Sequence, residues 1–194
     1  MISAVLLAAG ESRRMGKLKQ LLPLGESSFV EHCADRLIAS RVDEVIVVTG
    51  HREREIRRAL ANRSVTFAHN ATYQSGMTSS IQCGLRAANP NAEAIIIALV
   101  DQPRIRSETI NQLVDAFQTV PSPAIVIPSY QGRNGHPILL NAVVKDEVLA
   151  LRHDESLRQV VAGHASQVDH VEVSDSAVVE DFDLPQDYER LVNQ

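Results

Sequence analysis

Short apolar runs rich in β-branched residues alternate with amphipathic stretches along this chain, and that alternation restricts the fold more than any other feature of the sequence. The apolar runs are almost unbroken, which is typical of strands buried on both faces of a sheet. Strands are predicted at residues 2–9, 44–49, 65–68, 94–100 and 124–127, and helices at residues 29–40, 53–61, 79–88 and 107–119.

The helical periodicity is clearest in residues 107–119. Apolar residues recur there at positions i, i+3, i+4 and i+7 from Ile110, and Ser107 is predicted to cap the first turn. Strands that alternate with such helices form βαβ units. The sequence therefore predicts an α/β fold, a Rossmann-like open, mostly parallel twisted sheet with helices on both faces.

The last third of the chain is less regular. A turn-rich loop at residues 129–136 precedes a strand-like run at 137–140. Beyond it, helices are predicted near residues 142–151 and 156–162, strands at 167–173 and 178–182, and a final helix after Pro185. The sequence shows no repeat, low-complexity tract or linker within its 194 residues, so a single domain over residues 1–194 is predicted.

Charge and composition exclude several classes of protein. The net charge of −5 disfavours a dedicated binder of nucleic acid or of anionic membranes. The longest apolar run has seven residues, whereas a membrane span needs about 20. No basic segment precedes the first strand, so we expect no signal peptide and a cytoplasmic protein. Cys33 and Cys83 lack metal or redox spacing and are expected to be unreactive thiols.

The loop after the first strand, residues 7–19, has a glycine at position 10, another at position 16, and four cations against one acid. At the carboxyl edge of an open α/β sheet, such a loop can bring backbone N–H groups and basic side chains to a triphosphate. Its spacing matches neither a Walker A loop nor a GxGxxG dinucleotide motif. On composition alone, a turn with solvated basic side chains explains it equally well.

An acidic residue ends the fourth predicted strand. Asp101 follows seven apolar residues, so it should project at the same sheet edge as the glycine loop. Carboxylate oxygens suit Mg²⁺, which takes one or two of them together with substrate phosphates. Asp181 or Asp183 could supply a second ligand. Alternatively, Asp101 caps the following helix, and the acids near the C-terminus are simply solvated.

A third signal is the small polar loop at residues 70–80, which leads into a helix. Its hydroxyl groups could hydrogen-bond the edge of a nucleobase. Equally, Ser79 or Ser80 could only cap the helix.

Together these segments resemble a known family. The order LAAGxSxRMGxxKxLL at residues 7–22, GMTSS at 76–80, DQP at 101–103, GHP at 135–137 and DFDLPQD at 181–187 resembles the molybdenum cofactor cytidylyltransferases. These are nucleotidyltransferases similar to molybdenum cofactor guanylyltransferase, with a fold like that of nucleotide-diphospho-sugar transferases. The resemblance implies a cytoplasmic enzyme that uses CTP and Mg²⁺ to transfer CMP to the molybdopterin-bound molybdenum cofactor, with release of pyrophosphate. It also implies delivery to an apo-molybdenum hydroxylase.

The resemblance carries over to individual positions. It implies a catalytic set of Arg14 and Lys19, which would hold the phosphates, with Asp101. It implies Asp101 and Asp183 as metal ligands, with Asp181 as a rival to Asp183. The nucleotide-binding residues it implies are Leu7, Ala8, Ala9, Gly10, Arg14, Lys19, Gly76, Ser79 and Ser80.

For the acceptor, the resemblance implies that Gly135, His136 and Pro137 bind the pterin. The alternative is a histidine in a tight turn before a strand. Ala9 stands where guanylyl-transferring relatives tend to have glycine, which favours CTP. Leu184 departs from the family pattern, which commonly has threonine there.

The chemistry needs few groups. An acceptor phosphate can attack the α-phosphorus without a side-chain nucleophile, so positioning and electrostatic stabilisation suffice. A cytidylyl- or other nucleotidyltransferase that acts on a sugar or polyol phosphate remains an alternative, as does a non-catalytic carrier of the molybdenum cofactor. A regulatory nucleotide-binding module is a weaker alternative. The mixed charges of residues 52–58 are typical of a solvated helix face.

Overall fold

The computed structural model describes residues 1–119, 121–152 and 154–192. Its main sheet has the strand order β10-β7-β9-β6-β1-β4-β5, with β8 paired to β7. Adjacent pairs around β1 are parallel, whereas β9 runs antiparallel to both β6 and β7. The strands are β1 (Ile2–Leu7), β4 (Glu44–Thr49), β5 (Thr66–His69), β6 (Ala94–Leu99), β7 (Ile125–Tyr130), β8 (Arg133–Asn134), β9 (Ile138–Asn141) and β10 (Val168–Glu172). The predicted open, mostly parallel α/β sheet is confirmed.

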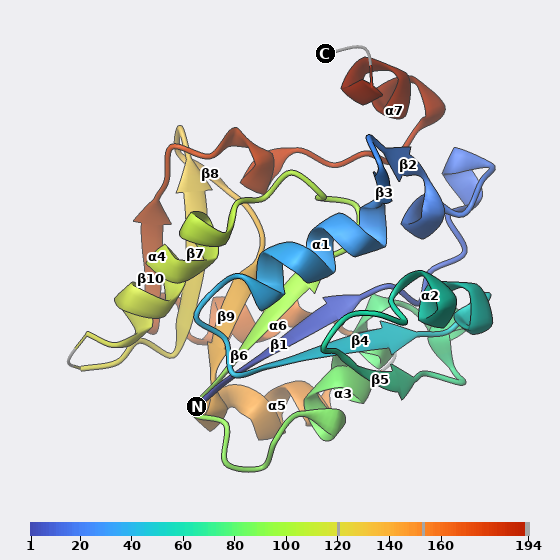
Figure 1. Cartoon of the computed structure of the whole chain (residues 1–194). Coiled ribbons are helices and arrows are strands. Elements are labelled where there is room, and N and C mark those ends of the chain that lie inside the picture. Colours follow the sequence, from blue (N-terminus) through green and yellow to red (C-terminus); the bar gives the residue numbers. More distant parts are fainter. Residues whose placement is uncertain (120, 153, 193–194) are drawn as a thin grey trace.

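Helices cover both faces of this sheet (Figure 1). The helices are α1 (Phe29–Ile38), α2 (Glu53–Ala59), α3 (Met77–Ala87), α4 (Ser107–Phe117), α5 (Lys145–Ala150), α6 (Leu157–Gly163) and α7 (Pro185–Val192). A small hairpin of β2 (Pro23–Leu24) and β3 (Ser27–Ser28) stands apart from the main sheet. No helix within residues 1–119, 121–152 and 154–192 has the length and apolarity that a membrane crossing requires.

The core follows from the period of two along each strand. In β1, Leu6 belongs to the apolar layer under α1, α2 and α4, whereas Val5 belongs to the layer that packs against α3, α5 and α6. The α3 helix lies so close to β1 that a Cβ on Gly84 would stand 2.2 Å from a methyl group of Val5. The near-continuous apolar strands in the sequence are the consequence of this two-sided burial.

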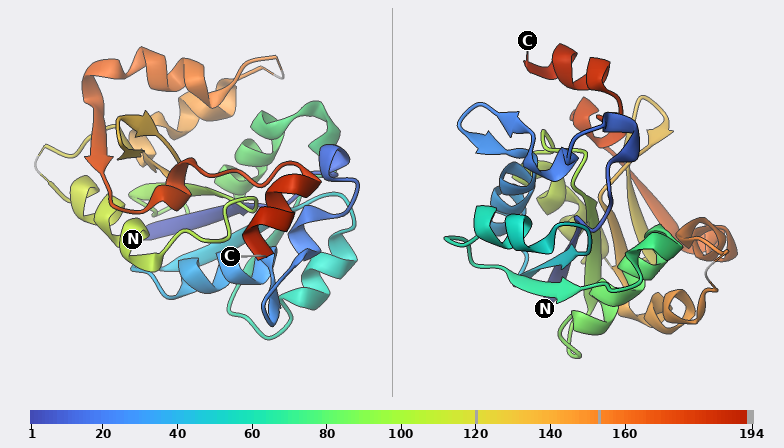
Figure 2. Two further views of the ribbon diagram at one scale, coloured as in Figure 1. Left: turned by 90° about the horizontal axis from the view of Figure 1, so that it is seen from above. Right: turned by 90° about the vertical axis from the view of Figure 1, so that its right-hand side faces the viewer.

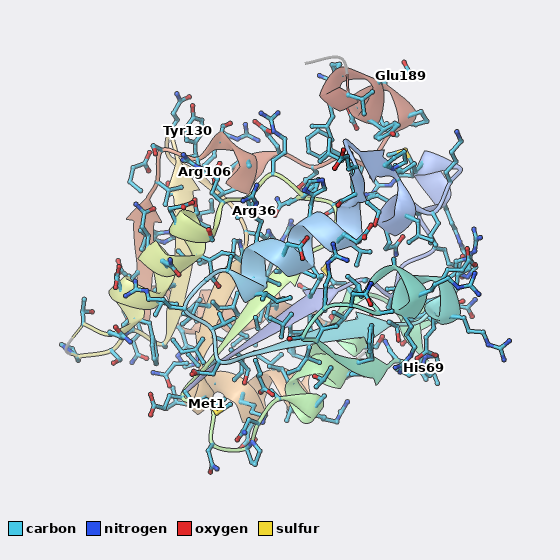
Figure 3. All side chains as sticks on the ribbon, viewed as in Figure 1. Met1, Arg36, His69, Arg106, Tyr130 and Glu189 are labelled. Atoms are coloured by element: carbon cyan, nitrogen blue, oxygen red, sulfur yellow. The ribbon has the colours of Figure 1, made fainter. Side chains whose placement is uncertain are left out.

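A third apolar cluster lies beyond the end of the sheet. Met15, Leu22, Phe29, Phe182 and Leu191 pack together, so the loop after β1 is attached to the C-terminal segment. Figures 1 and 2 show α7 lying over the β2–β3 hairpin, and Figure 3 marks Met1 and Glu189 at opposite ends of the molecule. This cluster holds segments more than 160 positions apart beside the carboxyl ends of β1 and β6.

Two local predictions are wrong. The strand expected at residues 178–182 is a 3-10 turn, Ser176–Val179, followed by irregular chain. Its backbone groups bond to loops instead of a strand: the Val178 carbonyl accepts from His136 N–H, and Phe182 N–H donates to the Asp101 carbonyl. Ser107 does not cap α4. Instead, the Asp175 carboxylate accepts a hydrogen bond from Arg106 N–H at 3.0 Å.

Candidate active site

A cavity of about 410 Å³ opens at the carboxyl ends of β1 and β6. This is the edge at which open α/β sheets bind ligands. Four separate segments of the chain line it: the loop after β1, the residues around the start of α3, the end of β6 up to Asp101, and the chain at Asp183. The lining residues are Leu7, Ala9, Gly10, Glu11, Ser12, Arg13, Arg14, Met15, Lys19, Gln20, Tyr73, Gln74, Gly76, Met77, Ser80, Leu99, Val100, Asp101 and Asp183.

The loop after β1 is held in shape by Gln20, which is 1% exposed. Its amide nitrogen donates to the carbonyls of Ala8 (2.9 Å) and Gly10 (2.8 Å), and its amide oxygen accepts from Ser12 Oγ (3.1 Å). Ser12 Oγ in turn accepts from Lys19 N–H at 3.0 Å. Sequence reasoning missed Gln20 because a buried amide that bonds to backbone leaves no pattern. Its place directly after Lys19 was the available signal.

Lys19 lies at the centre of the charged groups. Its side chain is 8% exposed, and Nζ lies 2.5 Å from Asp183 Oδ1 and 3.3 Å from Asp101 Oδ2. Arg14 lies at the rim, with a guanidinium nitrogen 2.6 Å from Asp183 Oδ2. The structure therefore brings together the two cations and two carboxylates that the sequence singled out, from three distant parts of the chain.

The surroundings of the Asp101 carboxyl disfavour its charged form. Burial raises its pKa, and the negative charges of Asp181 and Asp183 act in the same direction, while the Lys19 ammonium opposes the shift. Among the described residues, Asp101 Oδ1 has no hydrogen-bond partner. A buried oxygen without a donor, beside a second carboxylate, suits a divalent cation.

The donor set fits a metal that is shared with a substrate. No three His, Cys, Asp or Glu side chains of the described chain gather into a complete metal centre. Two carboxylates alone match Mg²⁺, which usually keeps waters and takes phosphate oxygens as its remaining ligands. Asp183 lines the cavity, whereas Asp181 Oδ1 accepts a hydrogen bond from Gln102 Nε2 (3.0 Å) and lies outside the lining.

The loop before α3 and the first turn of α3 also line the cavity. Gly76 and Ser80 line the cavity, whereas Ser79 lies outside it and donates to the Gly76 carbonyl at 2.8 Å. Gln74 Nε2 donates to Glu11 Oε1 at 3.0 Å and so joins this loop to the loop after β1. Hydrogen bonds from Arg13 first, and then from Gln74, lower the pKa of Glu11 to about 2.

Of the residues at the end of β1 and just after it, some line the cavity and one belongs to the core. Leu7, Ala9 and Gly10 line the cavity, but Ala8 is 1% exposed and belongs to the core layer under α1. The backbone of Ala8 is nevertheless fixed beside the cavity because its N–H donates to the Val48 carbonyl at 2.9 Å.

The 135–137 segment lies outside the cavity lining. Gly135 N–H donates to the Pro128 carbonyl, and the Val178 carbonyl leaves no room for a Cβ at position 135. The His136–Pro137 peptide bond is cis. Burial lowers the pKa of His136, although the nearby charges of Asp101 and Asp181 oppose the shift. The imidazole is thus a neutral group within the electrostatic reach of the cavity's carboxylates.

Comparison with known proteins identifies the family. The family described as the MobA-like NTP transferase domain matches residues 4–171. The chain belongs to this family. As a MobA-like protein it is a nucleotidyltransferase, which confirms both the predicted enzyme class and the predicted resemblance.

Several relatives of this MobA-like protein match it over nearly its whole length. Nicotine blue oxidoreductase of Paenarthrobacter nicotinovorans is 28% identical, with 98% of this chain and 96% of the relative covered. The molybdenum cofactor cytidylyltransferase of Escherichia coli K12 is 26% identical, with 96% and 93% covered. The structure of Rv0371c of Mycobacterium tuberculosis H37Rv in complex with manganese matches with a TM-score of 0.83 and 25% identity, covering 100% of this chain and 98% of that chain.

Proposed function

We propose that this protein is a CTP:molybdenum cofactor cytidylyltransferase, which transfers CMP to the molybdopterin-bound cofactor and releases pyrophosphate in a Mg²⁺-dependent reaction in the cytoplasm. The observation that carries the proposal is the contact of Lys19 with Asp101 and Asp183 on the wall of a cavity at the sheet edge. The cations Lys19 and Arg14 and the carboxylates of Asp101 and Asp183 line this one cavity, which supports the binding of nucleotide phosphates together with a metal.

Nucleotide phosphates would bind along the loop after β1. Ala9, Gly10 and Arg14 all line the cavity. Lys19 would exchange its carboxylate partners for phosphate oxygens when a nucleotide arrives, because its Nζ already lies between the two carboxylates. A Mg²⁺ held by Asp101 and Asp183 would supply positive charge to the α-phosphate and to the pyrophosphate that leaves.

The transfer itself requires no side-chain nucleophile. The acceptor's phosphate oxygen attacks the α-phosphorus, the bond to the pyrophosphate breaks, and Lys19 and Arg14 stabilise the charge that grows on the leaving group. Neither cysteine takes part. Burial raises the pKa of the Cys33 thiol, which keeps it protonated.

The acceptor would approach from the side of Gly135, His136 and Pro137. The charges of Asp101 and of Arg158, a cation on α6, both act on the pKa of His136, so His136 is within electrostatic reach of the candidate metal site and of α6. A neutral imidazole there can hydrogen-bond or stack on a pterin ring. The proposed recipient of the product is an apo-molybdenum hydroxylase.

The base would lie against Ser80 and Gly76, which line the same cavity. Ala9, where guanylyl-transferring relatives tend to have glycine, supports CTP. The relative from Escherichia coli, named a molybdenum cofactor cytidylyltransferase, supports the same substrate. Because the relative from Paenarthrobacter carries the name of an oxidoreductase, an assay has to decide.

The deciding assay is a nucleotide panel. The purified protein is given Mg²⁺, molybdenum cofactor and CTP, GTP, ATP or UTP in turn, and pyrophosphate release and the cytidylylated pterin are measured. We expect CTP to react best. Faster turnover with GTP or ATP would show that the base assignment is wrong, and turnover with a sugar or polyol phosphate in place of the pterin would show that the acceptor is wrong.

A further inference from the structure

Asn70, at the start of the loop before α3, is 4% exposed, and its amide orientation is fixed by its surroundings. Its oxygen accepts from the backbone N–H and the hydroxyl of Thr72, both at 3.0 Å. Since a backbone N–H can only donate, the amide cannot be turned round. The amide nitrogen therefore faces α3, where it donates to Ser79 Oγ at 2.9 Å and to Ser80 Oγ at 3.0 Å.

These hydrogen bonds determine which role, donor or acceptor, each of the two serine hydroxyl groups has left. Ser79 Oγ accepts a hydrogen bond from Asn70 and donates its own proton to the carbonyls of Gly76 (2.8 Å) and Thr72 (3.2 Å). Ser80 Oγ also accepts from Asn70, but no acceptor for its proton is found among the described residues. Ser80 lines the cavity and is 6% exposed. Its hydroxyl is thus a nearly buried donor left over for a ligand.

We propose that Asn70 is a positioning residue that makes the Ser80 hydroxyl a donor to ring atom N3 of the bound pyrimidine, and that the pair thereby selects cytosine over uracil. The inference rests on the proposed function, in which the base lies against Ser80. Cytosine N3 is an acceptor, whereas uracil carries a proton on N3. With uracil, the Ser80 hydroxyl would have to turn its second lone pair toward N3–H, and its own proton would then have no acceptor among the described residues, in a nearly dry site.

The test is equilibrium binding of CTP and of UTP, with Mg²⁺ and without an acceptor, to the full chain by isothermal titration calorimetry. The wild type should bind CTP at least about tenfold more tightly than UTP. Asn70→Asp presents a carboxylate that accepts from Ser80, so the hydroxyl then offers a lone pair to the base. In this variant the CTP/UTP ratio should fall at least about tenfold. Ser80→Ala should bring the ratio close to one.

Ser75→Ala is the matched control. It removes a hydroxyl that bonds to the Thr72 carbonyl of the same loop but lies outside the cavity lining, so the CTP/UTP ratio should hold. A loss of selectivity caused by loosening of the loop would appear in this variant too. If Asn70→Asp does not fold, the wild type with 3-deazacytidine triphosphate asks the same question, because that nucleotide lacks the N3 acceptor and should bind at least about tenfold more weakly than CTP.

The outcomes separate this inference from the proposed function. A wild-type protein that binds neither CTP nor UTP refutes the proposed function. A wild type that binds CTP, with an unchanged CTP/UTP ratio in Asn70→Asp and Ser80→Ala, leaves the proposed function standing and overturns the role of Asn70. Equal binding of CTP and 3-deazacytidine triphosphate overturns it as well.

Discussion

At the scale of single residues, the candidate site depends on one buried ammonium between two carboxylates. Lys19 can be buried because Asp183 and Asp101 both lie within reach of its Nζ. Removing the ammonium would leave two carboxylates without their shared cation, which costs more than the pairing itself contributes, whereas removing Asp101 leaves Lys19 paired with Asp183. The sequence predicted these three residues from their motifs. It did not predict Gln20, whose buried amide bonds to the backbone of its own loop, or Asn70, whose buried amide bonds to Thr72 and to hydroxyl groups of α3.

Replacing Lys19 tests whether its ammonium acts on the phosphates specifically, or whether any loss of positive charge from this loop has the same effect. Lys19→Gln keeps a polar side chain but removes the ammonium, so we expect turnover to fall by about 10²–10³ because growing phosphate charge loses its stabilising cation. Pyrophosphate release at saturating CTP measures the effect. Lys17→Gln is the matched control, since Lys17 is exposed and lies outside the cavity lining. Equal losses in the two variants would contradict the role of Lys19.

Asp101→Asn tests the metal ligand without a change of size. The amide should hold a divalent cation poorly, and turnover should fall at least about a hundredfold. The melting temperature should hold or rise, because burial and two neighbouring acids raise the pKa of this carboxyl and make its charged form costly. Thermal unfolding checks the melting temperature, and Mn²⁺ binding followed by electron paramagnetic resonance checks the loss of the metal ligand. Full activity in this variant would remove the argument for the metal.

At the scale of elements, hydrophobic periodicity predicted the regular strands and helices. The irregular segments and the helix start that it did not predict depend on contacts between residues far apart in the sequence. The strand at residues 44–49 was predicted to the residue, because both faces are apolar. The expected strand at 178–182 is apolar for another reason: Val178 and Phe182 are buried from an irregular chain, and Phe182 belongs to the apolar cluster beside the loop after β1. The start of α4 likewise depends on Asp175, 69 positions from the Arg106 N–H that it accepts from, and no local pattern encodes that partner.

The start of α1 gives a prediction about acid stability. Burial alone would raise the pKa of Glu31, but hydrogen bonds from Ser28 and the charge of Arg63 outweigh it, and the pKa is lowered. A carboxyl with a lowered folded-state pKa stabilises the fold above its ordinary value of 4.5, and this contribution is lost as the pH falls through the folded-state value. Glu31→Gln should therefore cost about 1 kcal/mol at pH 7.

The measurement is the free energy of unfolding by urea, for wild type and Glu31→Gln, from pH 7 down to pH 3. The gap between the two proteins should be constant near neutrality and close as the acid limb is reached. Glu26→Gln, at an exposed position in the turn between β2 and β3, is the control and should follow the wild type throughout. A stability difference that widens toward low pH would show that folding raises the pKa of Glu31 instead of lowering it.

At the scale of the whole molecule, the site is assembled by packing between the two ends of the chain. Asp183 follows Phe182 and precedes α7, and both Phe182 and Leu191 of α7 belong to the apolar cluster that holds the loop after β1. The Tyr188 hydroxyl adds a hydrogen bond to the Pro23 carbonyl at 2.8 Å. The sequence motifs predicted which residues would meet at the sheet edge, but not that an apolar contact outside the main sheet would bring them there.

Leu191→Ala tests that assembly at a distance from the cavity. Leu191 is 7% exposed, so its truncation should cost about 2–4 kcal/mol of unfolding free energy and loosen the segment that carries Asp183. Because Asp183 would then be held less firmly beside Lys19, CTP should bind more weakly although no lining residue has changed. Val192→Ala, at a 47% exposed position on the same helix, should change neither quantity. If Leu191→Ala lowered stability but left CTP affinity intact, the C-terminal helix would serve the fold alone, and Asp183 would owe its place to its ion pairs with Lys19 and Arg14.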